Sequence, residues 1–260
     1  MFDAVKERDN IVSFIREYYA KNHLKGAVLG ISGGKDSGVV AGLMCEAIGP
    51  ENVVGITMPC HSKSRDAADA QLVAEKFGFE MINIDLTDTF DSFVAQIDKL
   101  GTFSAEEKKN ADINLKPRLR MSTCYYMAAL LSATKGGTYL VPGTSNLAEL
   151  FLGYFTKFGD SAHDFEIISH LTVEEVIKVG EVVGVGVVVG QGGGQTVDDG
   201  VGDLLAVHIG DHGEVLEVLN TVADGLQTDG LHASVNVEVL TAVEQDAVAV
   251  AVEGIKAVGV

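Results

Sequence analysis

The residues with the clearest chemical potential form a glycine-rich loop, Gly30-Ile31-Ser32-Gly33-Gly34-Lys35-Asp36-Ser37. The loop follows an apolar run at 27–31 and precedes a helical pattern at 36–48. In a parallel sheet, a strand-to-helix turn presents backbone N–H groups and a helix N-terminus to an anion. Glycines let the backbone approach a phosphate closely, and Ser32 and Ser37 add hydroxyl donors. The loop therefore predicts a site for the phosphates of a nucleotide.

Two common phosphate-binding motifs do not fit this loop. A Walker loop needs Ser or Thr directly after its lysine, whereas Lys35 is followed by Asp36. The glycine spacing of a dinucleotide fingerprint is absent from the loop. A plain turn, with Asp36 as a capping carboxylate, is the alternative interpretation. Ser-Gly-Gly-Lys-Asp-Ser between a strand and a helix favours nucleotide binding over that alternative.

Alternating strands and helices must position the loop. Apolar runs predict four strands, at 27–31, 53–58, 80–86 and 138–141. Helical patterns occupy 5–21, 36–48, 64–77, 88–99 and 112–135 (entered through Pro117), and another helix begins at Ser145 or Asn146. This alternation predicts an α/β fold, a doubly wound parallel sheet with helices on both faces.

Charge and cysteine content exclude several function classes. The 260 residues carry a net charge of −18, which disfavours binding to a nucleic-acid backbone. No apolar stretch is long enough for a membrane span, and the first ten residues contain no apolar signal core, so we expect a cytoplasmic protein without membrane contact. Cys45, Cys60 and Cys124 are far apart and are expected to be reduced thiols.

The composition changes near residue 179. Residues 179–260 contain one basic residue, Lys256, together with 13 acidic residues and 22 valines, and they lack aromatic residues. The segment could be a natural low-complexity tail, a designed sequence, or one whose printed side chains differ from the natural ones; the latter two are favoured. We expect 1–260 to form a single domain, with 179–260 as its compositionally anomalous part and with a backbone close to the active site. Function is therefore inferred from residues 1–178.

The loop resembles the SGGxDS loop of the N-type ATP pyrophosphatases, which split ATP into AMP and pyrophosphate while activating a carboxyl or carbonyl oxygen. The resemblance implies an adenine nucleotide alpha hydrolase-like fold and a Mg²⁺ ion held by Asp36. It also implies that ATP is bound by Gly30, Ile31, Ser32, Gly33, Gly34, Lys35, Asp36 and Ser37.

Two further blocks narrow the resemblance. The segment from Gly143 to Asp160, GTSNLAELFLGYFTKFGD, looks like a block of NAD synthetase. The segment 114–121, NLKPRLRM, is similar to a second block of that family. Three blocks in this order are specific, so residues 1–178 resemble an ammonia-dependent NAD synthetase, whereas 179–260 match only faintly.

The resemblance assigns roles residue by residue. Glu149 would share Mg²⁺ with Asp36, or it is only a first-turn helix carboxylate. Thr144 would bind ATP, or it only starts a helix. Deamido-NAD would contact Arg118, Tyr125, Phe155, Lys157 and Asp164, although the two aromatic side chains are equally compatible with a core position. Arg120 could equally be a solvated helix charge and is not assigned to the site.

The implied reaction is the amidation of deamido-NAD to NAD. The nicotinate carboxylate attacks ATP to form an acyl-adenylate and pyrophosphate, and ammonia then displaces AMP. This route needs no protein nucleophile. The resemblance also implies a homodimer, and free ammonia or a separate glutaminase would supply the nitrogen. A tRNA-modifying ATP pyrophosphatase and a nucleotide-binding scaffold without turnover are the alternatives, and the acidic chain without a CxxC pair disfavours the former.

Overall fold

The central element is a four-stranded parallel sheet. The structure, a computed structural model, describes residues 2–61 and 65–185. The strands are β1 (Leu24–Gly30), β2 (Val53–Thr57), β3 (Glu80–Asn83) and β4 (Thr138–Leu140), in the order β3-β2-β1-β4. Because β2 and β4 flank β1 on opposite sides, the strand order reverses at β1. Open α/β sheets bind their ligands at such a reversal, beyond the carboxyl ends of the strands.

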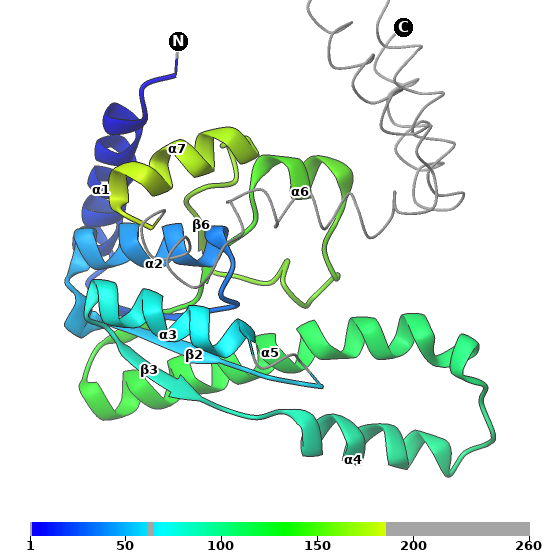
Figure 1. Cartoon of the computed structure of the whole chain (residues 1–260). Helices are drawn as coiled ribbons and strands as arrows, with labels where there is room; N and C mark the ends of the chain where they lie inside the picture. The colour runs from blue at the N-terminus through cyan, green and yellow to red at the C-terminus, as the bar shows by residue number, and fades with distance from the viewer. Residues whose placement is uncertain (1, 62–64, 186–260) are drawn as a thin grey trace, which may run out of the picture. The chain divides into compact units, whose positions relative to one another are not determined.

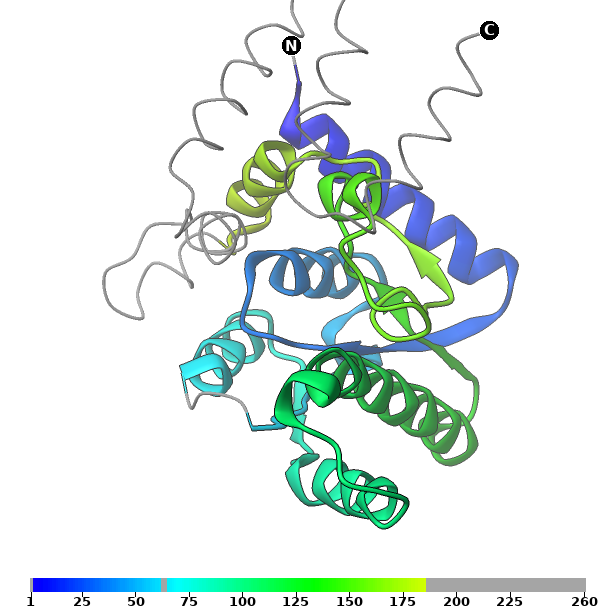
Figure 2. The same ribbon diagram turned by 90° about the vertical axis from the view of Figure 1, so that its right-hand side faces the viewer.

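Helices cover both faces of the sheet (Figures 1 and 2). Ala27 and Leu29 of β1 point into one core, whereas Val28 points into the other. The first core is shared with α1 (Ala4–Lys21), α2 (Lys35–Ile48), α3 (Arg65–Phe77) and α7 (Val173–Val183). The second is shared with α4 (Thr87–Asp98) and α5 (Ala105–Lys135). The predicted doubly wound fold is therefore confirmed.

Local sequence signals explain most helix boundaries. Asp3 caps α1 by accepting a hydrogen bond from the backbone N–H of Lys6. The helix buries Ile11, Val12, Ile15 and Tyr19 against the sheet, whereas Val5 is half exposed. The strand β3 ends at Asn83, three residues before the predicted end.

The start of α5 corrects a prediction. The helix begins at Ala105, and Pro117 lies inside it instead of at its entrance. Ser104 and Glu107 form a reciprocal capping box, which satisfies orphan N–H groups at the true start. Proline inside a helix removes one backbone hydrogen bond, and the 31-residue length of α5 tolerates that loss.

Smaller elements lie at both ends of the strands. A 3₁₀ helix (Pro50–Asn52) precedes β2, and α6 (Leu147–Leu152) starts at the predicted position, capped by Asn146. Two short strands, β5 (Pro142–Gly143) and β6 (Phe165–Glu166), pair in parallel.

The compositionally distinct segment begins inside the described core. Val179 and Val185 are buried against the first core, at the end of α7. The rest of the prediction for 179–260 concerns 186–260, which lie outside the described residues, and the single-domain assignment stays a prediction. Among the described helices, none is long and apolar enough to cross a membrane.

Candidate active site

A pocket of about 410 Å³ opens at the carboxyl ends of the strands, where the strand order reverses. It brings the three sequence blocks together, although more than a hundred residues separate the first block from the last. Its lining includes residues from the ends of β1 and β2, from the middle of α5, from β5 and from the segment that follows α6. These are Gly30, Ile31, Ser32, Ser37, Thr57, Met58, Arg120, Met121, Cys124, Val141, Gly143, Thr144, Gly159, Asp160 and Ala162, together with Ile56, Pro59, Pro117 and Pro142.

Hydrogen bonds of Ser32 and Ser37 fix the conformation of the glycine-rich loop. Ser37 Oγ donates to the carbonyl oxygen of Gly34 at 3.1 Å and accepts from the backbone N–H of Ser32 at 3.3 Å. Ser32 Oγ accepts from the N–H of Gly34 at 3.2 Å. Gly33 has a φ of 84°, a conformation that favours glycine. The loop leads directly into α2, whose first-turn N–H groups remain for an anion.

Charged side chains gather at the start of α2. Lys35 Nζ lies 3.0 Å from Asp36 Oδ2, and both side chains are largely buried. Asn146 Nδ2 donates to Asp36 Oδ1 at 3.4 Å, across 110 positions in the chain. The backbone N–H of Asn146 donates to Glu149 Oε2 at 3.0 Å. Asn146 therefore joins the two carboxylates to which the sequence assigns Mg²⁺.

The electrostatics of Glu149 favour a cation beside it. Burial raises the pKa of Glu149, and the nearby negative charge of Asp36 raises it further. In residues 2–61 and 65–185, no cluster of three or more acidic, His or Cys side chains is arranged for a metal. Mg²⁺, however, is commonly held by one or two carboxylates together with substrate phosphates. Asp36 and Glu149 fit that donor set.

The raised pKa of Glu149 gives a testable dependence of stability on pH. A carboxyl whose pKa is higher in the folded state adds stability below its ordinary pKa of 4.5, and that contribution is lost as the pH rises through the raised value. The wild-type free energy of unfolding should therefore fall as the pH rises from below 4.5 through the raised pKa of Glu149. Without Mg²⁺, we expect this fall to be smaller in Glu149→Gln, whose side chain does not titrate. Urea titrations at several pH values measure the free energy of unfolding of both proteins. Glu174→Gln, in the exposed first turn of α7, is the control, and equal slopes for wild type and Glu149→Gln would contradict the prediction.

The residues predicted to contact the dinucleotide lie beside the pocket rather than in its lining. Tyr125 Oη donates to Asp164 Oδ1 at 3.3 Å, and burial together with the Asp164 charge raises the pKa of Tyr125 to about 12. Arg118 Nε donates to the carbonyl oxygen of Lys157 at 3.1 Å. Phe155 is exposed, so its ring is not a core residue. The structure thus joins four of the five residues in two pairs and leaves the Phe155 ring exposed, and their roles remain predictions.

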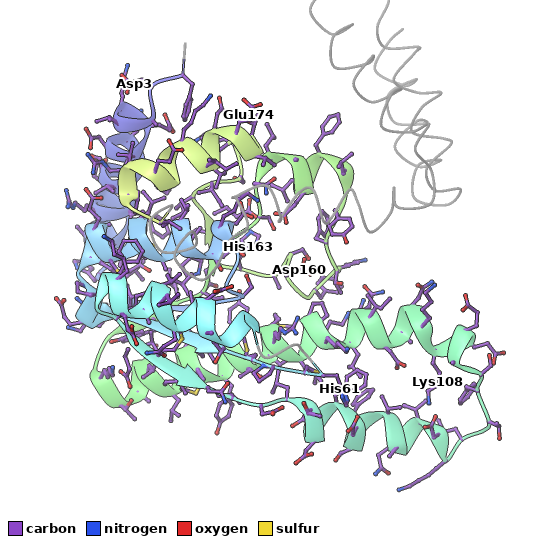
Figure 3. The ribbon with its side chains drawn as sticks, viewed as in Figure 1. Asp3, His61, Lys108, Asp160, His163 and Glu174 are labelled. Atoms are coloured by element: carbon purple, nitrogen blue, oxygen red, sulfur yellow. The ribbon has the colours of Figure 1, made fainter. Side chains whose placement is uncertain are left out.

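Three polar residues of the site were not assigned from the sequence. Arg120, which was left out because it could equally be a solvated helix charge, lines the pocket and donates from Nε to the carbonyl oxygen of Met58 at 3.2 Å. Asp160, which is labelled in Figure 3, is another of the lining residues. Its carboxylate accepts a hydrogen bond from the N–H of Thr156 at 2.8 Å. Asn146 is only 2% exposed. All three lie in the two blocks that resemble NAD synthetase, which was the available signal, but only the fold shows where their side chains lie.

No nucleophilic cysteine is supplied by the pocket. Cys124 lines it, but burial raises the pKa of this thiol to about 11, so the thiol stays protonated at neutral pH. Together, the doubly wound sheet, the glycine-rich loop at its switch point and the carboxylate pair define a nucleotide-binding α/β domain of the adenine nucleotide alpha hydrolase type.

Comparison with known proteins narrows this class. The profile of the NAD synthase family matches residues 7–191, and the chain belongs to this family. The NH(3)-dependent NAD(+) synthetase of Carboxydothermus hydrogenoformans is 39% identical over 171 residues, which are 66% of this chain and 67% of that relative. That of Alkaliphilus oremlandii is 40% identical over 175 residues, again 66% and 67%. The predicted family and its ligase class are confirmed.

Solved structures agree with the assignment. The NH3-dependent NAD synthetase from Campylobacter jejuni, in complex with nitrate, has a TM-score of 0.65 and 28% identity, covering 91% of this chain and 93% of its own. The NMN synthetase from Francisella tularensis has a TM-score of 0.64 and 27% identity, covering 78% and 82%.

Proposed function

We propose that the protein forms NAD from deamido-NAD, ATP and ammonia through an acyl-adenylate, with release of AMP and pyrophosphate. The observation that supports this most directly is the meeting of three separate sequence blocks around one pocket at the switch point of the sheet. Membership in the NAD synthase family favours this reaction over that of a tRNA-modifying enzyme.

The glycine-rich loop and the start of α2 would hold the departing pyrophosphate. Backbone N–H groups of Ser32–Ser37 and the Lys35 ammonium supply positive potential where negative charge develops. Thr144 lies in the pocket wall, within reach of the nucleotide. Mg²⁺, when bound by Asp36 and Glu149, would neutralise phosphate charge. Asn146 would keep both carboxylates oriented.

The dinucleotide would lie along the side of the pocket formed by α5 and the segment after α6. Arg118 offers a guanidinium for a phosphate, and Lys157 lies in the adjoining segment. Tyr125 and Asp164 hold each other beside the pocket, and Phe155 presents an exposed ring on which a pyridine could stack. We place these five side chains against deamido-NAD on this basis.

The assay is formation of NAD from deamido-NAD, ATP and ammonium, with AMP and pyrophosphate measured in parallel. The acid form of NMN is offered as a second substrate, because the Francisella structure is named an NMN synthetase. Amidation of deamido-NAD with equimolar AMP supports the proposal. Nucleotide binding without turnover would leave only a binding scaffold, and amidation of the mononucleotide alone would reassign the substrate.

Replacement of Arg118 tests the dinucleotide side of the site. We expect Arg118→Ala to raise the KM for deamido-NAD about tenfold, the cost of losing one charge-assisted contact, with little change in the KM for ATP. Steady-state kinetics with each substrate varied in turn measure the effect. Arg16→Ala, on α1, is the control. Equal increases for both substrates would contradict the assignment.

We further propose that the protein is a cytoplasmic homodimer that uses free ammonia or ammonia from a separate glutaminase. Several large apolar side chains are exposed on α4, on α5 and on the connection between them, namely Phe93, Ile97, Leu100, Phe103 and Ile113. Such a surface is typical of a protein interface. We expect sedimentation to give twice the 27.4 kDa chain mass and Leu100→Asp to shift it toward the monomer. A wild-type monomer would contradict the dimer.

A further inference from the structure

A lysine occupies the first helical position of α2, where a positive charge is unfavourable. Lys35 follows the N-cap Gly34, so it lies in the turn that carries the positive end of the helix macrodipole. Its side chain is nevertheless only 10% exposed. Burying an ammonium group costs free energy unless the group is paired. Helix stability therefore does not explain a lysine at this position, and the explanation must come from the groups that surround it.

The partner of Lys35 is the aspartate that follows it in the chain. Lys35 Nζ lies 3.0 Å from Asp36 Oδ2, and the Asp36 side chain is only 20% exposed. The other carboxylate oxygen, Oδ1, accepts from Asn146 Nδ2 at 3.4 Å. Both oxygens of the carboxylate to which we assign Mg²⁺ therefore have a donor within the protein itself.

Lys35 also lies among carboxylates that repel one another. Burial raises the pKa of Glu149, and the charges of Asp36 and Asp160 raise it further. The Lys35 ammonium and the N–H of Asn146 act in the opposite direction. An ammonium among three carboxylates offsets part of their repulsion, which is the electrostatic role that a bound divalent cation performs.

We propose that Lys35 takes the place of Mg²⁺ at Asp36 while no nucleotide is bound, and that it moves to the ATP phosphates when nucleotide binds. Without nucleotide, the ammonium competes with a divalent cation for Asp36 Oδ2. With nucleotide, the phosphates offer Lys35 a new anionic partner, and its departure leaves the Asp36 oxygen to the metal. The proposal rests on the proposed function, which assigns Mg²⁺ to Asp36 and the phosphates to the adjoining loop.

The position of Lys35 in the loop allows this exchange of partners. Ser32 and Ser37, on either side of Lys35 in the chain, line the pocket. A lysine carries its ammonium on a flexible stem, so it can exchange a carboxylate oxygen for a phosphate oxygen and stay paired. The exchange couples the two ligands. A divalent cation should therefore bind weakly to the free protein and more tightly to the protein that holds nucleotide.

Binding of Mn²⁺ to the full chain without nucleotide tests the competition. Mn²⁺ is the probe because the unbound ion is measured directly by electron paramagnetic resonance. We expect Lys35→Gln to bind Mn²⁺ about tenfold more tightly than the wild type, a coupling of ordinary size. Lys35→Arg, which keeps the positive charge, should bind it as weakly as the wild type. Lys135→Gln, which breaks the 3.0 Å pair of Lys135 with Glu80, is the control for release of a carboxylate elsewhere.

An opposite effect on ATP separates the exchange from a structural role. At saturating Mg²⁺ and without deamido-NAD, equilibrium dialysis should show that Lys35→Gln binds ATP about tenfold more weakly, because the phosphates lose one charge-assisted contact. Lys135→Gln should bind ATP like the wild type. If Lys35→Gln binds both ligands more weakly, the substitution only distorts the loop and the proposal is wrong. Unchanged ATP binding would overturn it as well.

The gain in Mn²⁺ binding must also depend on Asp36. In an Asp36→Asn background, Lys35→Gln should leave Mn²⁺ binding unchanged, because there is no carboxylate for which the ammonium competes. A gain that persists in this background would indicate general charge repulsion and would contradict the exchange. None of these measurements needs turnover. If the amidation assay fails while both opposite effects are present, the inference stands and the proposed function does not. If amidation proceeds and Lys35→Gln binds Mn²⁺ like the wild type, the inference is wrong.

Discussion

Replacing Asp36 by asparagine should reduce NAD formation on the order of 1000-fold while the fold persists. Asparagine keeps an oxygen that can accept the hydrogen bond from Asn146 Nδ2, but it removes the negative charge beside Lys35. A preorganised charge beside the reacting phosphates stabilises the transition state by several kcal/mol. Loss of that stabilisation corresponds to the expected loss of rate, on the order of 1000-fold. Pyrophosphate release and the thermal transition of the variant are the two measurements.

The control for this variant is Asp88→Asn. Asp88 is likewise an acidic residue in the first turn of a helix, α4, but it is exposed, whereas Asp36 is paired with Lys35 and accepts a hydrogen bond from Asn146. Any general effect of removing a helix-start carboxylate appears in both variants. If Asp36→Asn keeps near wild-type turnover at limiting Mg²⁺, the metal assignment of Asp36 is wrong.

The elements around the site differ in how far the sequence predicts them. The strands β1, β2 and β4 and the glycine-rich loop were predicted because apolar runs and glycines are local signals. The early start of α5 was missed because Pro117 imitates a first-turn proline, and the capping box at Ser104 lies in a polar stretch. The β5–β6 pair has two residues per strand, too short for any periodic pattern.

In the site, the contacts between residues far apart in the chain could not be predicted from the sequence. The sequence blocks identify Asp36 and Glu149, but the contact from Asn146 to Asp36 joins residues 110 positions apart and exists only in the folded chain. Arg120 was missed for a related reason. On α5 the sequence pattern does not say which of two nearby arginines faces the pocket, and the structure shows that Arg120 does.

Asn146 performs two tasks that can be separated by substitution. Its Oδ1 caps α6 by accepting from the N–H groups of Ala148 and Glu149, while its Nδ2 donates to Asp36. Asn146→Ala should remove both, costing about 1 kcal/mol of stability for the cap. It should also reduce turnover about 10- to 100-fold, as loss of a partner that orients a metal-binding carboxylate does.

Asn146→Ser should restore the cap but not the turnover. A serine hydroxyl caps helices about as well as asparagine, yet its shorter side chain does not extend to Asp36 as the amide does. We therefore expect the unfolding free energy of the serine variant to return close to wild type, while half-maximal activity still needs more Mg²⁺ than in the wild type. Thr172→Ala removes the equivalent cap of α7, whose hydrogen bond goes to the N–H of Glu175 and to neither carboxylate, and should lower stability alone. If the serine variant recovered both properties, Asn146 would act only as a helix cap, and the orientation of Asp36 would have to come from Lys35 and the loop backbone.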